Sequence, residues 1–412
     1  MEWRYFDPGQ DLDAAIRLWH DIGWMNREAA GARPGMEAYT AACTGYVALV
    51  HGLPECFVFQ TPGNLRHGHA ELPLCAVAGV ATSRNARKQG LALRLTARAI
   101  AEAAVQGAAI AGLSTFEQGF YNRIGFGSAA YEHTWSLDPA RLTVTGAVRP
   151  PHRLENLPAE ALHEARRNRH RAHGSVTLDS PLMTRATMLR TPNGFGLGYS
   201  DDPKETPSHG LWCGTANPGH GPYTIEFLAW KTPAQFRELL GLIRQWGDQV
   251  RLVVLPEPAG IQLQDLIDRP TQHYWSTEGG NFASGNRAHA YYQYRILDLG
   301  ACVRATRLAT PPLDFNLQLH DPMQAHPVPG VDWNGIAGGY TVRLGPESDL
   351  RDGHDPALPV LTASAGAFTR LWLGVRPATG LAVTDELAGP PELLAALDET
   401  LRLPAPVTDW RF

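Results

Sequence analysis

Val80-Ala81-Thr82-Ser83-Arg84-Asn85-Ala86-Arg87-Lys88-Gln89-Gly90-Leu91-Ala92-Leu93 is the stretch of sequence that decides the fold. The apolar run 74–82 that leads into it is typical of a buried strand. Residues 91–106 repeat their apolar positions at helical spacing, and Gly107 ends that pattern. Residues 108–114 predict a second strand. A strand, a helix and a strand of these lengths indicate a crossover between parallel strands.

The turn between strand and helix carries the chemistry. Gly90 lets the backbone approach a ligand closely, and the first amides of the following helix are free donors with partial positive charge. Arg87, Lys88 and Arg94 add positive charge nearby. Such a turn suits a pyrophosphate. A basic surface turn before a helix would have the same pattern, but the position between a strand and an amphipathic helix favours a binding site.

The rest of the chain has further elements. Residues 11–24 predict an amphipathic helix after the breaker Pro8-Gly9, and 45–50 and 56–59 predict short strands. A second strand–helix–strand pattern covers 223–255, with Thr232-Pro233 as N-cap and first turn. The chain therefore contains two copies of one fold, although their sequences differ.

The last part of the chain reads as α+β. Residues 313–320 alternate between apolar and polar, which predicts a half-buried strand. Residues 366–374 and 391–401 predict short helices. Pro- and Gly-rich joins near Pro150-Pro151 and at 279–285 are candidate boundaries.

Composition excludes several classes of protein. A chain of 412 residues is too long for one ordinary core, so two or three domains are expected. A net charge of −5 gives no basic footprint for nucleic acid. We expect a cytoplasmic protein that does not enter membranes, because neither a signal peptide nor an apolar run of about 18 residues is evident. The five cysteines are scattered along the sequence, so we expect neither disulfides nor a cysteine metal site.

Two other motifs favour ordinary structural roles. The basic run 166–171 is typical of a solvated helix face or loop. His67-Gly68-His69, near Glu71, has no third ligand at motif spacing, so a polar loop is the better reading and no metal is expected.

A second stretch, Glu117-Gln118-Gly119-Phe120-Tyr121-Asn122-Arg123-Ile124-Gly125-Phe126-Gly127, sharpens the interpretation. Together with Arg-x-x-Gly-x-Ala after the strand, it resembles the Eis (enhanced intracellular survival) branch of the GNAT N-acetyltransferases. The resemblance implies α/β and α+β architecture. Tandem GNAT folds, with mixed sheets flanked by helices, would cover 1–145 (catalytic) and 146–284 (degenerate), and a sterol-carrier-protein-like α+β domain would cover 285–412. It also implies a homo-oligomer, a hexamer.

The resemblance implies a role for each matching residue. Tyr121 would be the general acid, and the terminal carboxylate on Phe412 would be the general base. The residues implied to contact acetyl-CoA are Val80, Ala81, Thr82, Arg87, Lys88, Gln89, Gly90, Leu91, Ala92, Leu93, Phe116 and Glu117. Outside the family, Tyr121 also fits a packed aromatic, Phe412 a frayed end and Glu117 an exposed carboxylate.

These residue types suit acetyl transfer from acetyl-CoA to a primary amine of a small molecule or a lysine side chain. A carboxylate can take the ammonium proton, a strand amide near 80–82 can stabilise the oxyanion, and a phenol can protonate the leaving thiolate. No cysteine has a visible activating partner, so direct attack in a ternary complex is expected. Arg411, next to the terminus, argues against polycationic aminoglycosides. The alternatives are a non-catalytic coenzyme A sensor, or lipid or hydrophobic-ligand binding by the C-terminal domain.

Overall fold

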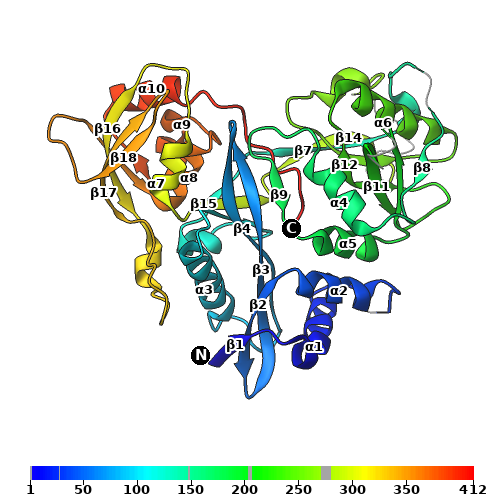
Figure 1. The fold of residues 1–412 in the computed structure, drawn as a ribbon, viewed down its shortest axis with the longest axis horizontal. Coiled ribbons are helices and arrows are strands. Elements are labelled where there is room, and N and C mark those ends of the chain that lie inside the picture. Colours follow the sequence, from blue (N-terminus) through cyan, green and yellow to red (C-terminus); the bar gives the residue numbers. More distant parts are fainter. Residues whose placement is uncertain (1, 27, 147–148, 203–206, 271–279) are drawn as a thin grey trace.

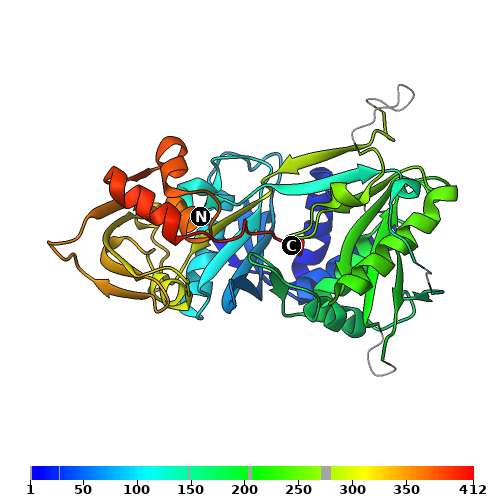
Figure 2. The same cartoon turned by 90° about the horizontal axis from the view of Figure 1, so that it is seen from above.

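The computed structural model describes residues 2–26, 28–146, 149–202, 207–270 and 280–412. Strands in this part of the chain form three sheets, and Figures 1 and 2 show them side by side with the first sheet in the middle. We call each sheet with its helices a unit: the first with α1–α3, the second with α4–α6 and the third with α7–α10. Within the described residues, no helix is both long and apolar enough to cross a membrane.

The first unit holds the stretch around Gly90. Its sheet order is β1-β2-β3-β4-β5-β15-β6, with β9 paired to β3. Phe57 and Phe59 pack in the core beside α1 and α2, whereas Cys56 and Val58 pack in the core beside α3, so both faces of the sheet are buried. The elements are β1 Glu2–Tyr5, α1 Pro8–Asp21, α2 Ala32–Ala41, β2 Thr44–Val50, β3 Leu53–His67, β4 Ala70–Thr82, α3 Leu91–Val105, β5 Ile110–Ser114, η1 Tyr121–Ile124, β6 Gly127–Ser128, β9 Val176–Leu178 and β15 Tyr292–Ile296.

The second unit repeats the strand–helix–strand plan. Its sheet order is β14-β7-β13-β12-β11-β10-β8, and the predicted N-cap Thr232 is confirmed, because its side chain accepts a hydrogen bond from the Gln235 amide. The elements are β7 Glu132–Leu137, η2 Pro139–Arg141, β8 His152–Arg153, α4 Ala159–Arg167, α5 Pro181–Arg190, β10 Phe195–Tyr199, β11 His209–Thr215, β12 Tyr223–Ala229, α6 Pro233–Gln245, η3 Trp246–Asp248, β13 Val253–Pro256, η4 Leu263–Leu266 and β14 Gly285–His289.

The third unit is α+β, with sheet order β18-β17-β16-β19-β20. The strand predicted from alternation at 313–320 is confirmed as β16, and Phe315, Phe368 and Trp372 are buried in the core. The elements are α7 Leu299–Ala305, β16 Leu313–His320, η5 Pro322–Ala325, β17 Gly338–Leu344, β18 Asp349–Asp352, β19 Val360–Ser364, α8 Ala365–Trp372, α9 Ala378–Thr384, β20 Leu387–Ala388 and α10 Pro391–Thr400.

The units exchange strands, which the expected limits after residues 145 and 284 did not anticipate. Strand β7 lies before the first limit but joins the second sheet, and β9 lies after it but joins the first. Past the second limit, β14 joins the second sheet and β15 joins the first. These limits therefore do not coincide with changes of sheet. Part of the Gly-rich join at 279–285 (residue 279) lies outside the described residues.

Two local interpretations were wrong. Pro8-Gly9 does not break a helix but starts one: Pro8 is the first residue of α1, where its missing N–H costs nothing, and Asp7 caps the helix by accepting from the Gly9 amide. The basic run 166–171 is not fully solvated, because Arg166 and Arg169 are 3% and 7% exposed.

Candidate active site

Strand β4 opens away from β5 at its C-terminal end. The two strands pair in parallel only as far as Val77 and Leu113, although β4 continues to Thr82. Opposite Val58 of β3, β4 carries two residues, Gly79 and Val80, which makes a bulge. Residues 78–82, including the predicted Val80, Ala81 and Thr82, therefore extend past the last pairing with β5. A ligand could pair with the strand there.

Glycine is required at this bulge. Gly79 has φ of +60°, and an added Cβ would lie 2.8 Å from the Trp19 ring and 2.9 Å from the Tyr39 hydroxyl oxygen. Gly79 was not among the site residues predicted from the sequence. A lone glycine inside a strand pattern was the available signal, because such glycines mark bulges.

The turn before α3 is open at the helix N-terminus. Gly90 is the N-cap with φ of +75°, and no side chain caps the helix. Lys88 also has positive φ, 63°, which curls the turn. Among the described residues, Arg87 and Lys88 form no ion pair, and both are exposed. Free amides and two unpaired cations are the features that suit this turn to an anion. Gln89 is exposed, Leu91 and Leu93 are buried, and Ala92 is half-buried.

Tyr121 lies at the start of η1, on the face of the sheet that α3 covers. It is 9% exposed, and burial is the first cause that raises the pKa of its phenol, followed by the nearby Cys56 and Glu117. The Thr82 hydroxyl donates to Cys56 Sγ at 3.2 Å, so the end of β4 lies in the same neighbourhood. A phenol with a raised pKa stays protonated at neutral pH and can donate a proton.

Phe116 and Glu117 follow β5 at the surface. The Phe116 side chain is 88% exposed, and Glu117 is exposed as well. The Glu117 backbone is fixed to Thr115, whose Oγ1 donates to the Glu117 carbonyl at 2.9 Å. Both side chains are accessible to a ligand.

The last residues of the chain return to the end of β5. Ser114 Oγ, at the C-terminal end of that strand, donates to an oxygen of the Phe412 terminal carboxylate at 3.3 Å. The Phe412 ring lies 5.2 Å from the Tyr292 ring, and an added Cβ at Gly112 would lie 3.4 Å from it. Phe412 therefore contacts the first sheet, but none of these contacts joins it to Tyr121.

A cavity of about 890 Å³ lies where the first sheet, the second sheet and the tail meet. Ser114 and Phe412 line it, whereas Tyr121 and residues 80–93 do not. Arg411 also lines it, and its guanidinium pairs with Glu226 of β12 at 3.1 Å. Glu226 offsets the charge of Arg411, so Arg411 is not a free cation. This weakens the expectation that Arg411 disfavours polycationic aminoglycosides.

Glu132 is a cavity residue that the sequence analysis missed. It begins β7, and Thr408 of the tail donates hydrogen bonds to its carboxylate. Burial raises the pKa of Glu132 to about 8, against the opposing effect of Arg411. A carboxyl group with this pKa can exchange protons near neutral pH. No motif surrounds Glu132, so only its position identifies it.

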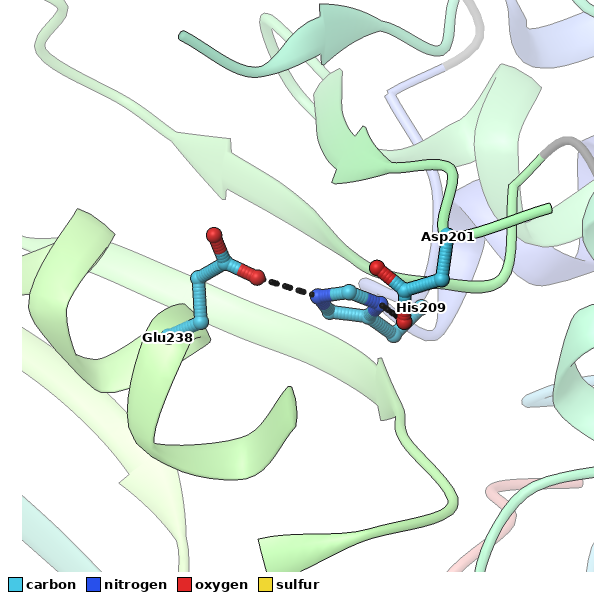
Figure 3. A group of neighbouring side chains, drawn as sticks. All are labelled: Asp201, His209 and Glu238. Atoms are coloured by element: carbon cyan, nitrogen blue, oxygen red, sulfur yellow. Dashed lines mark hydrogen bonds and ion pairs between the residues drawn. The ribbon is translucent and has the colours of Figure 1, made fainter. Parts of the chain in front are cut away.

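A carboxylate–histidine group stands apart on the second unit, where Asp201 and Glu238 flank the buried His209 (Figure 3). His209 Nε2 lies 3.0 Å from Glu238 and its Nδ1 3.6 Å from Asp201. Arg149 contacts both carboxylates at 2.7 and 2.8 Å. The Arg149 guanidinium thus supplies the positive charge beside both carboxylates. We therefore interpret the group as a network of ion pairs.

Of the two histidines in the stretch 67–71, His67 has structural partners. His67 is buried, with Nε2 3.2 Å from the Trp372 carbonyl and its ring stacked on Trp372 at 4.2 Å. Glu71 pairs with Arg171 at 2.7 Å, and His69 is exposed. His67 thus fixes the β3–β4 hairpin to the third unit.

Comparison with known proteins agrees with this geometry. Residues 58–129 match a family model described as an acetyltransferase (GNAT) domain, and this stretch contains Gly79, Gly90 and Tyr121. An uncharacterised N-acetyltransferase of Streptomyces avermitilis is 34% identical over 74 residues. That match spans 18% of this chain and only 18% of the relative's own length.

Solved structures share the whole fold. A probable N-acyltransferase from Enterococcus faecalis V583 superposes with a TM-score of 0.76 at 18% identity, and Eis1 from Mycobacterium abscessus with 0.74 at 16%, each over 100% of both chains. A GCN5-related N-acetyltransferase from Kribbella flavida gives 0.73 at 18%, over 100% of this chain and 98% of that one. At these identities the likeness shows the fold. The stretch that matches the acetyltransferase (GNAT) family model lies in the first unit.

Proposed function

We propose that the protein transfers the acetyl group of acetyl-CoA to a primary amine of a small molecule or a lysine side chain, as Eis-like enzymes do. One observation carries the proposal: the bulge at Gly79 opens β4 away from β5 close to the uncapped N-terminus of α3. An extended pantetheine can pair with an open strand, and a pyrophosphate suits a free helix N-terminus.

In this proposal, each predicted residue has one task. The α3 amides, Arg87 and Lys88 hold the pyrophosphate. Backbone at 80–82 faces the thioester, with Phe116 and Glu117 near the far end of the coenzyme. The Tyr121 phenol donates a proton to the leaving sulfur, and the carboxylate of Phe412 takes one from the ammonium, so the amine attacks directly. No residue forms an acyl intermediate.

The test is a thiol-release assay with acetyl-CoA and a panel of amines: an aminoglycoside, a polyamine, a lysine peptide and an amino acid. Release of thiol together with an acetylated amine in the mass spectrum is the expected result. Coenzyme binding without turnover on any amine would favour the sensor instead.

The role of the terminus has its own test. Intact mass first establishes that the purified chain ends at Phe412. Adding one glycine after Phe412 moves the carboxylate by one residue, about 3.5 Å along an extended chain, and should lower kcat about 10²- to 10⁴-fold. An unchanged rate would remove Phe412 from the mechanism. Light scattering tests the hexamer that the resemblance implies.

A further inference from the structure

The end of the chain, residues 404–412, runs from the third unit to the junction of the first and second units; the tail is red in Figure 1. On the side of the first sheet, the Tyr294 hydroxyl of β15 lies 2.6 Å from Thr408 Oγ1. The Val407 amide donates to the His173 carbonyl at 3.1 Å. At Gly174, with φ of +84°, an added Cβ would lie 2.5 Å from the Val407 nitrogen. The loop after α4 is therefore shaped for close passage of the tail.

Asp409 is the strongest anchor of the tail. Its carboxylate accepts two hydrogen bonds from Arg169, at 2.5 and 2.9 Å, one from Ser175 Oγ at 3.1 Å and one from the Val176 amide at 3.1 Å. The Arg169 side chain is only 5% exposed, and it also donates to the Arg166 carbonyl at 2.6 Å. A forked, charge-assisted pair of this kind fixes direction as well as distance.

Trp410 is the second anchor. It is 2% exposed, and the guanidinium of Arg166 lies 3.7 Å from the centre of its ring. Phe227 of β12 covers the same guanidinium at 4.2 Å, and Thr184 accepts from it at 3.0 Å. Among the described residues, no carboxylate comes within ion-pair distance of Arg166. A buried cation without such a partner depends on the rings that cover it.

Strand β12 supplies a third contact. Its register with β11 shifts by one residue, which leaves Glu226 as the extra residue between the pairs Phe227–Trp212 and Ile225–Cys213. Glu226 pairs with Arg411 at 3.1 Å. Three consecutive tail residues, Asp409 to Arg411, thus each contact a side chain of the second unit. The first sheet adds the Val176 amide of β9 at Asp409 and the Tyr292 hydroxyl of β15, 3.5 Å from the Trp410 carbonyl oxygen.

We propose that the second unit is a holder for the tail, and that Arg169 and Arg166 are positioning residues for the carboxylate of Phe412. This rests on the proposed catalytic role of that carboxylate. Three residues of extended chain, about 10 Å, separate Asp409 from Phe412. A released tail would therefore move the carboxylate by several ångströms, and a misplacement of about 1 Å can already cost roughly 10²-fold in rate.

The experiment compares two arginines of one basic run. Arg169→Met removes the Asp409 contacts, whereas Arg171→Met, the matched control, removes only the pair with Glu71 on the first sheet. We expect Arg169→Met to lower kcat about 10- to 100-fold with an unchanged Kd for acetyl-CoA, and Arg171→Met to leave both unchanged. Arg169→Lys should recover part of the rate, because it keeps the charge but loses the fork.

A second readout follows the tail directly. Carboxypeptidase A removes an accessible C-terminal phenylalanine, and mass spectrometry measures its loss. Release of Phe412 should be at least about tenfold faster in Arg169→Met than in wild type or Arg171→Met. This readout needs no turnover, so it tests the holder even if the protein acetylates no amine.

Two results would overturn the holder. One is unchanged release of Phe412 in Arg169→Met, whatever happens to kcat, because the loss of rate would then come from elsewhere. The other is faster release with unchanged kcat in an active enzyme, because the position of the tail would then not matter. If Arg169→Met does not fold, Asp409→Asn removes the same ion pair at a side chain that is 25% exposed and is judged by the same two readouts.

Discussion

The first and second units share a strand–helix–strand plan and differ where a coenzyme would bind. In both, the strand before the helix carries one extra residue. In the first unit the bulge contains Gly79, which brings no side chain to the opening. In the second it is Glu226, whose carboxylate is engaged with Arg411. One plan thus gives an open strand edge in one unit and a contact for the tail in the other.

The two helix N-termini differ in the same sense. The first turn of α3 has only Gly90 as its cap, so its amides are free. The first turn of α6 has Pro233, which lacks an N–H, and a capping box in which Thr232 and Gln235 bond each other's backbone amides. The absence of side-chain caps, rather than the fold itself, leaves one of the two helix ends suited to an anion.

The largest expected difference between variants of the first and second units is in catalysis. Tyr121→Phe removes the proposed acid and should lower kcat about 10²- to 10⁴-fold, with the Kd for acetyl-CoA unchanged. Tyr223→Phe in β12 is the control, because that hydroxyl only donates to the Pro218 carbonyl at 2.9 Å. Steady-state kinetics and calorimetry measure both quantities. A Tyr121→Phe enzyme with the wild-type rate would show that Tyr121 is not the general acid.

The two bulges should respond differently to alanine. Gly79→Ala meets a positive φ and packed rings, so the free energy of unfolding should fall by about 2–4 kcal/mol. Glu226→Ala removes an ion pair whose arginine is 57% exposed, which should cost less than about 1 kcal/mol. Urea unfolding followed by circular dichroism gives both values. Equal losses would mean that the two bulges are equivalent.

The histidines between the units predict a loss of stability in acid. Burial lowers the pKa of His67 to about 3 and lowers that of His173 too, so at pH 5 the unfolded chain binds protons that the folded chain does not. Stability should therefore decrease as the pH falls below the unfolded pKa near 6.5, by about 2 kcal/mol at pH 5 for His67.

Urea unfolding at pH 7 and pH 5 measures this difference. His67→Phe should make the decrease between pH 7 and pH 5 smaller by about 2 kcal/mol, whereas His69→Ala, at an exposed site of the same hairpin, should leave the decrease unchanged. A difference between pH 7 and pH 5 that is the same in His67→Phe as in wild type would show that His67 does not contribute to the acid sensitivity.

The smallest effect concerns the cations of the open turn. Arg87→Ala combined with Lys88→Ala should weaken acetyl-CoA binding roughly threefold to tenfold, because exposed pairs contribute about 0.2–1 kcal/mol each. Arg237→Ala, on α6 of the second unit, should leave the affinity unchanged. Titration calorimetry at low salt measures both variants. Equal affinities of the wild type and both variants for acetyl-CoA would show that the pyrophosphate does not bind at this turn.

Part of the site was predictable because it is local. The spacing of apolar residues in 74–114 predicted β4, α3 and β5, and the glycine turn predicted the free helix N-terminus. Gly79 was missed although a glycine inside a strand was visible. Arg166 and Arg169 were misread because a basic run is usually solvated, and their partners Asp409 and Trp410 lie about 240 residues away.

By itself, the sequence determined the strand–turn–helix around Gly90, the N-cap at Thr232 and the strand 313–320, because periodicity and turn chemistry act over a few neighbouring residues. Only the tertiary structure decided which sheet β7, β9 and β15 complete, that Glu132 lines a cavity, and that the tail is held by Arg169. These depend on contacts between distant segments. No short-range pattern encodes such contacts, since their energy arises only once the chain is folded.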